Sequence, residues 1–161
     1  MLALLASPVL AAQGPTATSA SDVKAAYLYR FGPFIESPAP TGAPTLCVTG
    51  DNAVAGALER LAREDSAADK PVVKRDAGSA AGCAILFVGH DETHAAALLK
   101  TADGGSTLVV GEDAPFLRAG GMVAFILKDR KLHFSVNLAN VRAAHLKLSS
   151  ELLKHAAEVI E

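Results

Sequence analysis

The segment from Gly120 to Ala156 constrains the fold most. Apolar residues fill Met122–Leu127 almost without interruption, as in a strand that is covered on both faces. From Leu132 to Leu138 apolar and polar residues alternate, which is the period of a strand with one buried face. The charged stretch Lys128–Lys131 is long enough only for a turn, so the sequence predicts a hairpin of two antiparallel strands.

After the hairpin the spacing of apolar residues becomes helical. Val141 and Ala144 begin a short helical face, and after a break the spacing continues at Leu148, Leu152, Ala156 and Val159. Ser149 is the expected N-cap, because a Ser hydroxyl accepts a hydrogen bond from an unpaired amide of the first turn. The sequence therefore predicts a long C-terminal helix.

The middle of the chain alternates between strand-like and helix-like segments. Strands are expected at Thr45–Thr49, Pro71–Arg75, Cys83–Val88 and Thr107–Val110. Helices are expected at Ala53–Arg63 and Thr93–Lys100, with a short one beginning near Pro115. Such alternation favours parallel strands joined by right-handed crossovers. The predicted fold class is α/β: a three-layer sandwich with a mostly parallel sheet of about five or six strands, completed by the C-terminal hairpin and helix.

Length and composition predict one exported domain. A chain of 161 residues with 50% apolar and 20% charged residues can form one compact core, and its net charge of −2 gives no reason to expect nucleic-acid binding. No apolar run approaches the ~20 residues that span a bilayer. The first residues are apolar and reach a candidate signal-peptidase site at Val9–Ala11, although the usual basic start is missing. We expect residues 1–21 to be a signal-peptide remnant and disordered lead-in, and residues 22–161 to be a single domain.

Three strand ends carry a glycine followed by a polar residue: Gly50-Asp51, Gly89-His90 and Gly111-Glu112. In an open parallel sheet the carboxyl ends of the strands line the crevice where ligands bind, so these six residues are candidates for a small-ligand site. The alternative is structural, with each glycine forming a tight turn and each acid capping the next helix. The clustered acids disfavour a nucleotide, because they would repel its phosphates.

Signs of catalysis or of a cofactor are weak. His90 and His94 are four residues apart and could face one metal on a helix, but His90 falls in a turn and no third ligand is evident. The sequence contains no nucleophile elbow, no phosphate-binding loop and no dinucleotide fingerprint. We therefore expect no catalytic residue, no metal and no cofactor.

The opening helix is the best candidate for a surface that binds a partner. Apolar residues recur at helical spacing and form its expected packed face: Val23, Ala26, Tyr27, Phe31 and Phe34. Leu28, Tyr29 and Arg30 are left partly outward, and Tyr29 and Arg30 belong to residue types that are enriched at interface hot spots. The alternative for Tyr29 is simple packing in the core, where helical aromatic residues usually lie.

Taken in order, these segments resemble the YfiR-like family. The resemblance covers about residues 22–157 and rests on the opening Val23–Phe31, on the strands at Leu46–Gly50 and Cys83–Gly89, and on the C-terminal order from Gly120 to Lys154. The chain departs from the family pattern at three places. Ser37 replaces an aromatic residue, Pro33 interrupts the opening helix, and His145 stands where glycine is usual.

The resemblance implies a non-enzymatic periplasmic protein that docks on the periplasmic portion of an inner-membrane diguanylate cyclase. The resemblance also implies that the docked protein holds the cyclase inactive, which would keep cyclic-di-GMP and biofilm formation low. A sensor kinase is an equally compatible partner, and a homodimer is compatible as well. The alternative function is a periplasmic small-ligand-binding protein that uses the crevice at the strand ends.

The family often has cysteines at the positions of Cys47 and Cys83. In an oxidising periplasm, two cysteines on neighbouring strands can bond if their Cα atoms come within about 7 Å. The resemblance therefore favours a Cys47–Cys83 disulfide. The alternative is a pair of small buried thiols, which is how free cysteines often occur.

Overall fold

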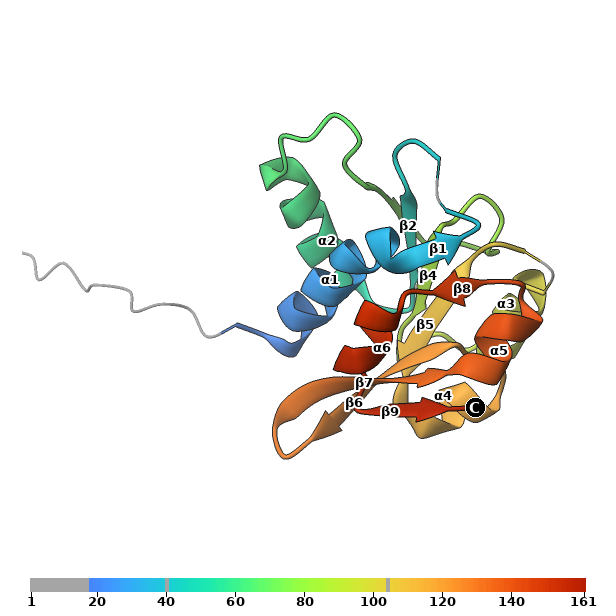
Figure 1. The fold of residues 1–161 in the computed structure, drawn as a ribbon. Coiled ribbons are helices and arrows are strands. Elements are labelled where there is room, and N and C mark those ends of the chain that lie inside the picture. The colour runs from blue at the N-terminus through green and yellow to red at the C-terminus, as the bar shows by residue number, and fades with distance from the viewer. Residues whose placement is uncertain (1–17, 40, 104) are drawn as a thin grey trace, which may run out of the picture.

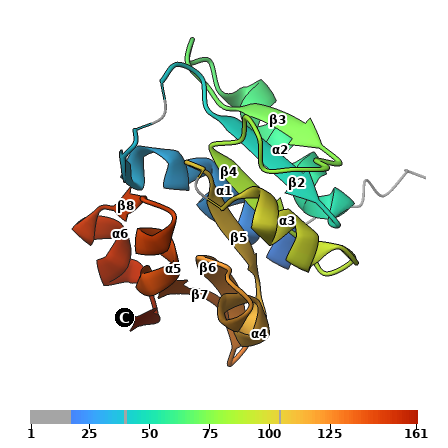
Figure 2. The ribbon, with the colours of Figure 1, turned by 90° about the vertical axis from the view of Figure 1, so that its right-hand side faces the viewer.

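The computed structural model describes residues 18–39, 41–103 and 105–161, which form a central sheet with helices on both faces (Figures 1 and 2). The sheet has seven strands in the order β3-β2-β4-β5-β6-β7-β9. Their bounds are β2 Thr45–Thr49, β3 Val72–Arg75, β4 Ile85–Val88, β5 Leu108–Glu112, β6 Val123–Lys128, β7 Lys131–Asn137 and β9 Glu158–Ile160. The five strands from β2 to β6 run parallel to one another, whereas β7 is antiparallel to β6 and forms the expected hairpin with it.

Two groups of helices cover the sheet. The helices are α1 Ala20–Phe31, α2 Asn52–Glu64, α3 Ala95–Thr101, α4 Asp113–Arg118, α5 Leu138–Ala143 and α6 Ser150–His155. Figure 2 shows α1 and α2 on one face and α3 on the other. On the first face, the ring of Tyr27 in α1 lies 5.9 Å from that of Phe125 and 5.6 Å from that of Phe134, measured between centroids. The predicted α/β class and mostly parallel sheet are confirmed.

Local sequence signals set the helix boundaries. The Ser19 side chain accepts from the backbone amide of Asp22, and the Asp22 carboxylate accepts from that of Ser19, so a capping box starts α1 at Ala20, before the expected domain start at residue 22. The rest of the predicted lead-in, residues 1–17, lies outside the described residues. Pro33 follows the end of α1 in a short 3-10 turn, Gly32–Phe34, because proline cannot donate the next helical hydrogen bond.

The predicted long C-terminal helix is wrong. Helix α6 begins after the expected cap Ser149 but ends at His155, and the backbone of Ala156 is extended (φ −67°, ψ 139°). The chain then forms β9, which pairs in parallel with β7. Strand β7 would otherwise expose a row of unpaired amides and carbonyls, and the β-branched Val159 and Ile160 suit a strand. With this pairing the sheet has seven strands, more than the five or six that the sequence predicts.

The chain segment before α6 also differs from expectation. Leu148 begins no helix; it lies in β8 (Lys147–Leu148), which pairs antiparallel with β1 (Ile35–Ser37) as a separate small sheet. His145 has a positive φ of 59°, so it occupies the left-handed conformation that glycine would adopt most easily. The turn therefore forms with His at this position.

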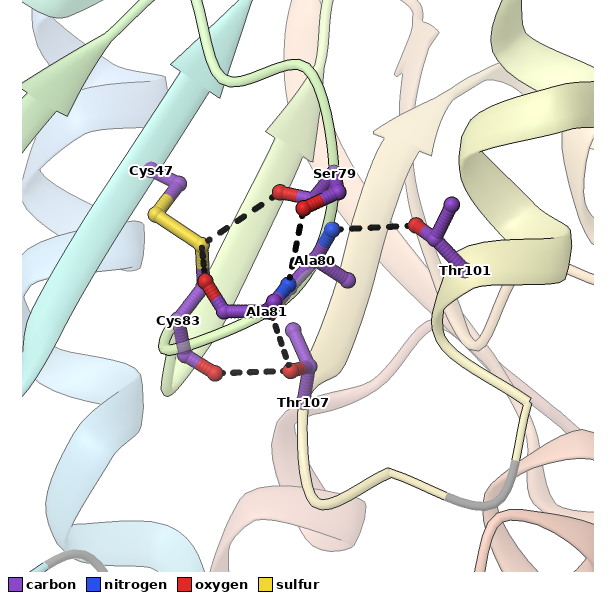
Figure 3. Close-up of a disulfide and its surroundings, with 7 residues drawn as sticks. All are labelled: Cys47, Ser79, Ala80, Ala81, Cys83, Thr101 and Thr107. Atoms are coloured by element: carbon purple, nitrogen blue, oxygen red, sulfur yellow. Dashed lines mark hydrogen bonds between the residues drawn. A yellow bond between two sulfur atoms is a disulfide. The ribbon is translucent and has the colours of Figure 1, made fainter.

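A disulfide links β2 to the loop before β4 (Figure 3). The Cα atoms of Cys47 and Cys83 are 5.8 Å apart, and both side chains are buried. The loop around Cys83 is fixed by two threonines. The Thr107 hydroxyl lies 2.7 Å from the Cys83 carbonyl oxygen, and the Thr101 hydroxyl accepts from the Ala80 amide at 2.9 Å. The cross-link therefore sits in a well-bonded part of the core.

Candidate functional site

The three glycine-containing strand ends lie side by side, because β2, β4 and β5 are neighbours in the sheet. The glycines permit close packing of chain segments. A Cβ atom on Gly89 would lie 2.5 Å from the carbonyl oxygen of Gly50, and one on Gly50 would lie 2.5 Å from the amide nitrogen of Glu92. A Cβ atom on Gly111 would lie 2.5 Å from the ring of Phe116. The space beside each glycine is thus filled by the protein itself.

The polar residues at these strand ends also have partners within the fold. Asp51 caps α2, as the structural alternative predicts, by accepting from the amide of Val54 at 2.9 Å. Glu112 accepts from the ammonium group of Lys24 in α1 and lies 2.8 Å from Nδ1 of His90. The Glu112 side chain is only 12% exposed, so this carboxylate holds α1 against the end of β5.

A shallow hollow of about 430 Å³ lies next to the end of β2, on the face covered by α3. It is lined by Thr49, Asp76, Ala77, Gly78, Glu92, His94, Ala97, Leu98 and Thr101. The Glu92 carboxylate accepts from the Thr49 hydroxyl and from the His94 amide, both at 2.6 Å, and these bonds lower the pKa of Glu92. The residues predicted for the crevice are absent from this lining, so the hollow and the predicted site are different places.

The two histidines considered for a metal have separate partners. His90 faces Glu112, whereas Nδ1 of His94 lies 3.1 Å from the Thr93 hydroxyl and 3.4 Å from the Glu92 carboxylate. Within the described ranges, no group of three or more His, Cys, Asp or Glu side chains is arranged to hold a metal ion. Helices in the same ranges are all too short or too polar to cross a bilayer.

A largely apolar hollow lies between α1 and α6, over β7, and we call it the α1–α6 groove. It has a volume of about 380 Å³. Its lining comprises Thr18, Asp22, Val23, Ala26, Tyr27, Arg30, Phe31, Phe34, Phe134, Leu152 and His155. The floor is aliphatic and aromatic, and the charged side chains come from the outer residues of α1 and α6. Such a surface suits apolar side chains of a partner.

The structure separates the two residues predicted to bind a partner. Arg30 is exposed and lines the α1–α6 groove. The hydroxyl of Tyr29 instead donates to the Asp65 carboxylate, 2.7 Å away, on the side of α1 that faces the end of α2. Burial, and next the bond to Asp65, raise the pKa of Tyr29 to about 12.

Sequence reasoning missed the contribution of the C-terminal half to this groove. Phe134 of β7 and Leu152 and His155 of α6 complete its lining, although they are more than 100 residues away from α1 in the chain. Periodicity marked Phe134 and Leu152 as apolar positions facing inward. Nothing in the sequence indicates that they line the same hollow as Ala26 and Arg30, because this depends on where the fold places α6 relative to α1.

The chain is a small α/β domain with an apolar groove on its surface. The sequence model of the family described as YfiR/HmsC-like matches residues 21–157, so the chain belongs to this family. A search of the curated proteins found no match. Among solved structures, one similar in fold is the ABC domain in complex with L-Trp from Streptococcus pneumonia, with a TM-score of 0.59 and 9% identity. The match covers 87% of this chain and 60% of that one.

Membership of the family suggests a periplasmic regulator of a diguanylate cyclase and a regulatory, non-catalytic role. The likeness to the streptococcal domain concerns the fold alone, because the sequences share so few residues.

Proposed function

We propose that this protein is a periplasmic regulatory protein that represses an inner-membrane diguanylate cyclase by binding its periplasmic portion at the α1–α6 groove. Bound cyclase would make less cyclic-di-GMP, and biofilm formation would fall. The groove is the observation that supports this proposal: an apolar hollow with aromatic walls and charged groups at its rim. The same surface could serve a sensor kinase, which is the alternative partner.

The walls of the groove are held in place before any partner arrives. The rings of Tyr27, Phe31 and Phe134 contact one another, with centroids 5.4 to 6.1 Å apart. On the far side of α1, the Tyr29–Asp65 hydrogen bond ties the helix to the end of α2. A preformed site loses little conformational entropy on binding, which favours affinity.

Repression requires only that the groove binds the inactive cyclase better than the active one. A ligand shifts a conformational equilibrium by its difference in affinity for the two states. Apolar anchors of the partner would fill the groove, while Arg30 and His155 at its rim would contact polar groups. The chain itself would need no chemical step.

The test is the cellular level of cyclic-di-GMP with the gene present, deleted and restored. A rise on deletion that reverses on restoration is expected. Restoration with a variant whose groove is blocked, such as Ala26→Glu, should fail to lower the level. An unchanged level in all strains under several growth conditions would contradict the proposal.

A second candidate function is binding of a small ligand near the carboxyl ends of the strands. One observation favours it, the hollow of about 430 Å³ beside the end of β2. The domain of similar fold was solved in complex with L-Trp, which supplies the first ligand to test. Calorimetric titration with L-tryptophan and other amino acids tests it. Thr49→Val removes a hydroxyl from the lining and should weaken any binding in this hollow. If the variant and the wild type gave the same binding heats, the ligand would bind elsewhere.

A further inference from the structure

The β6–β7 hairpin extends beyond the helices that cover the sheet, as the orange arm at the lower left of Figure 1 shows. Its turn is formed by Lys128, Asp129, Arg130 and Lys131, and all four residues are exposed. Leu127, the last apolar residue before the turn, is 69% exposed. A projecting tip of this kind combines one exposed aliphatic side chain with a cluster of charges.

Three features of this tip oppose the stability of the hairpin on its own. Lys128 and Lys131 are directly opposite each other, and like charges in such a pair repel. Arg130 has a positive φ of 61°, a conformation that suits glycine better than arginine. Leu127 exposes most of its side chain to water. The repulsion between the two lysines and the exposure of Leu127 are both relieved if the tip contacts a surface that is both negative and apolar.

The tip is positive in a protein that is slightly negative overall. Three cations against Asp129 give the turn a net charge of +2, whereas the chain carries −2. Across the described part of the chain, no ion pair engages Lys128, Arg130 or Lys131. Other cations, such as Arg60 and Arg75, do pair with carboxylates. The charges of the tip are therefore available to an outside group.

We propose that the β6–β7 tip binds the surface of a membrane that contains anionic phospholipids. Leu127 would enter the boundary between headgroups and acyl chains, and the three cations would contact lipid phosphates. A lipid surface fits better than a protein, because a stable protein interface buries about 800 Å² on each partner and the tip, Leu127 with the four residues of the turn, offers far less. Basic side chains near an anionic surface bind without any such matched area.

This inference goes beyond the proposed function. Its consequence would be that the protein is held at the membrane with the α1–α6 groove in a defined orientation. Leu132 lies opposite Leu127, and alternation along β7 places Phe134 on the same face as Leu132. Phe134 also lines the α1–α6 groove. A tip held at the membrane would thus keep the groove near the part of a membrane protein that emerges from the bilayer, and would raise its effective concentration there.

The test is co-sedimentation of the full chain with vesicles of phosphatidylglycerol and phosphatidylcholine, compared with phosphatidylcholine alone. Binding should require the anionic lipid and should weaken as salt is added. Each cation at the surface contributes roughly fivefold in affinity, so the triple variant Lys128→Ser/Arg130→Ser/Lys131→Ser should bind roughly a hundredfold more weakly. Leu127→Ser should weaken binding by about fivefold to tenfold.

Two matched controls and one conservative variant complete the test. Arg63→Ser/Lys74→Ser/Lys100→Ser removes the same charge from other exposed sites, and Val72→Ser removes another exposed apolar side chain, 55% exposed on β3. Both controls should bind nearly as the wild type does. Arg130→Gly relieves the positive φ, so it folds readily and should bind about fivefold more weakly.

The proposal would be overturned if the wild type bound neutral vesicles as well as anionic ones, or bound neither. Equal losses in the tip variants and the charge-matched control would also overturn it. If repression in cells required Leu127 but the protein did not co-sediment with vesicles, the tip would contact protein instead. Because the vesicles contain no cyclase, this result is independent of the proposed repressor role.

Discussion

The hydroxyl of Tyr29 and the carboxylate of Asp65 form a hydrogen bond of 2.7 Å that joins α1 to the residue following α2. The bond changes both acidities. It is the main cause of the lowered pKa of Asp65, and it adds to the effect of burial in raising the pKa of Tyr29. Because α1 forms one wall of the α1–α6 groove, this pair fixes the position of the groove from behind.

Tyr29→Phe should make stability less sensitive to acid. A carboxyl group whose pKa is lowered by folding stabilises the protein above the unfolded value of 3.8, and this contribution is lost as the pH falls through the folded value. The variant lacks the main cause of that shift. Urea unfolding at pH 7 and at pH 3 should therefore show a smaller loss for the variant than for the wild type. Asp22, Glu59 and Glu92 also have lowered pKa values, but they are common to both proteins and cancel in the comparison.

The same variant should differ in alkali. Tyr29 ionises at about 12 in the folded protein and at about 10 when unfolded, so its contribution is complete below pH 10 and disappears as the pH approaches 12. The wild type should lose stability over this interval, and Tyr29→Phe should lose less. Absorbance of ionised tyrosine during a pH titration gives a direct check, since Tyr29 should ionise late and this late step should be absent from Tyr29→Phe. Identical titration curves for the two proteins above pH 10 would contradict the bonded geometry.

Gly89→Ala should destabilise the protein by about 1–3 kcal/mol, as overpacking of a filled site does. The new Cβ atom would lie 2.5 Å from both the Gly50 carbonyl oxygen and the Cβ of Asp51, so backbone must move. Gly78→Ala is the matched control, because open space surrounds its added Cβ atom. Chemical unfolding of the two variants measures the difference. Equal stability would show that the strand ends are looser than described, with room for a ligand.

Most of the sheet could be predicted from the sequence, because its strands are short apolar runs between clear turns. Strand β2 lies at Thr45–Thr49 as expected, and the β6–β7 hairpin follows from the alternation after Leu132. The starts of α2 and α6 could be predicted as well, because their N-caps, Asp51 and Ser149, are local signals. These features depend on residues close together in the chain.

The features that were missed depend on distant contacts. Strand β9 forms because β7 offers an open edge, and the spacing of Leu152, Ala156 and Val159 cannot reveal that edge. The groove depends on the position of α6 relative to α1. Tyr29 lies on the opposite side of α1, where its hydroxyl bonds to Asp65. Helical spacing also gave a packed face that was partly wrong. The buried residues of α1 are Ala25, Leu28 and Phe31, whereas Val23, Ala26, Tyr27 and Phe34 are half-buried and line the groove, because the groove leaves that side of the helix open.

Loss of the Cys47–Cys83 disulfide should lower the free energy of unfolding by about 3–4 kcal/mol in the chain-entropy model. The bond joins residues 36 apart, which restricts a sizeable part of the unfolded chain. The comparison is Cys47→Ala/Cys83→Ala against the wild type in urea, with and without reductant. Reductant should destabilise the wild type and leave the variant unchanged. Two titratable thiols in the unreduced, unfolded wild type would contradict the bond.

Ala26→Glu should abolish repression while leaving the fold intact. Ala26 is a half-buried residue of α1 that lines the α1–α6 groove, so glutamate would bring a charge to its apolar floor. Glutamate is a good helix former, so α1 itself should persist. A partner's apolar anchor would then have to desolvate the carboxylate, which is strongly unfavourable. Cyclic-di-GMP in cells with this variant should reach the level of the deletion strain.

The matched control is Ala53→Glu, which makes the same change at an exposed position in the first turn of α2, where negative charge is favourable. It should repress as the wild type does. Circular dichroism and periplasmic abundance of both variants separate a blocked groove from poor folding. If both variants repress normally, the α1–α6 groove does not bind the partner, and the docking surface lies elsewhere on the domain. If Ala26→Glu alone fails while folded and abundant, the groove is the contact that turns the cyclase off.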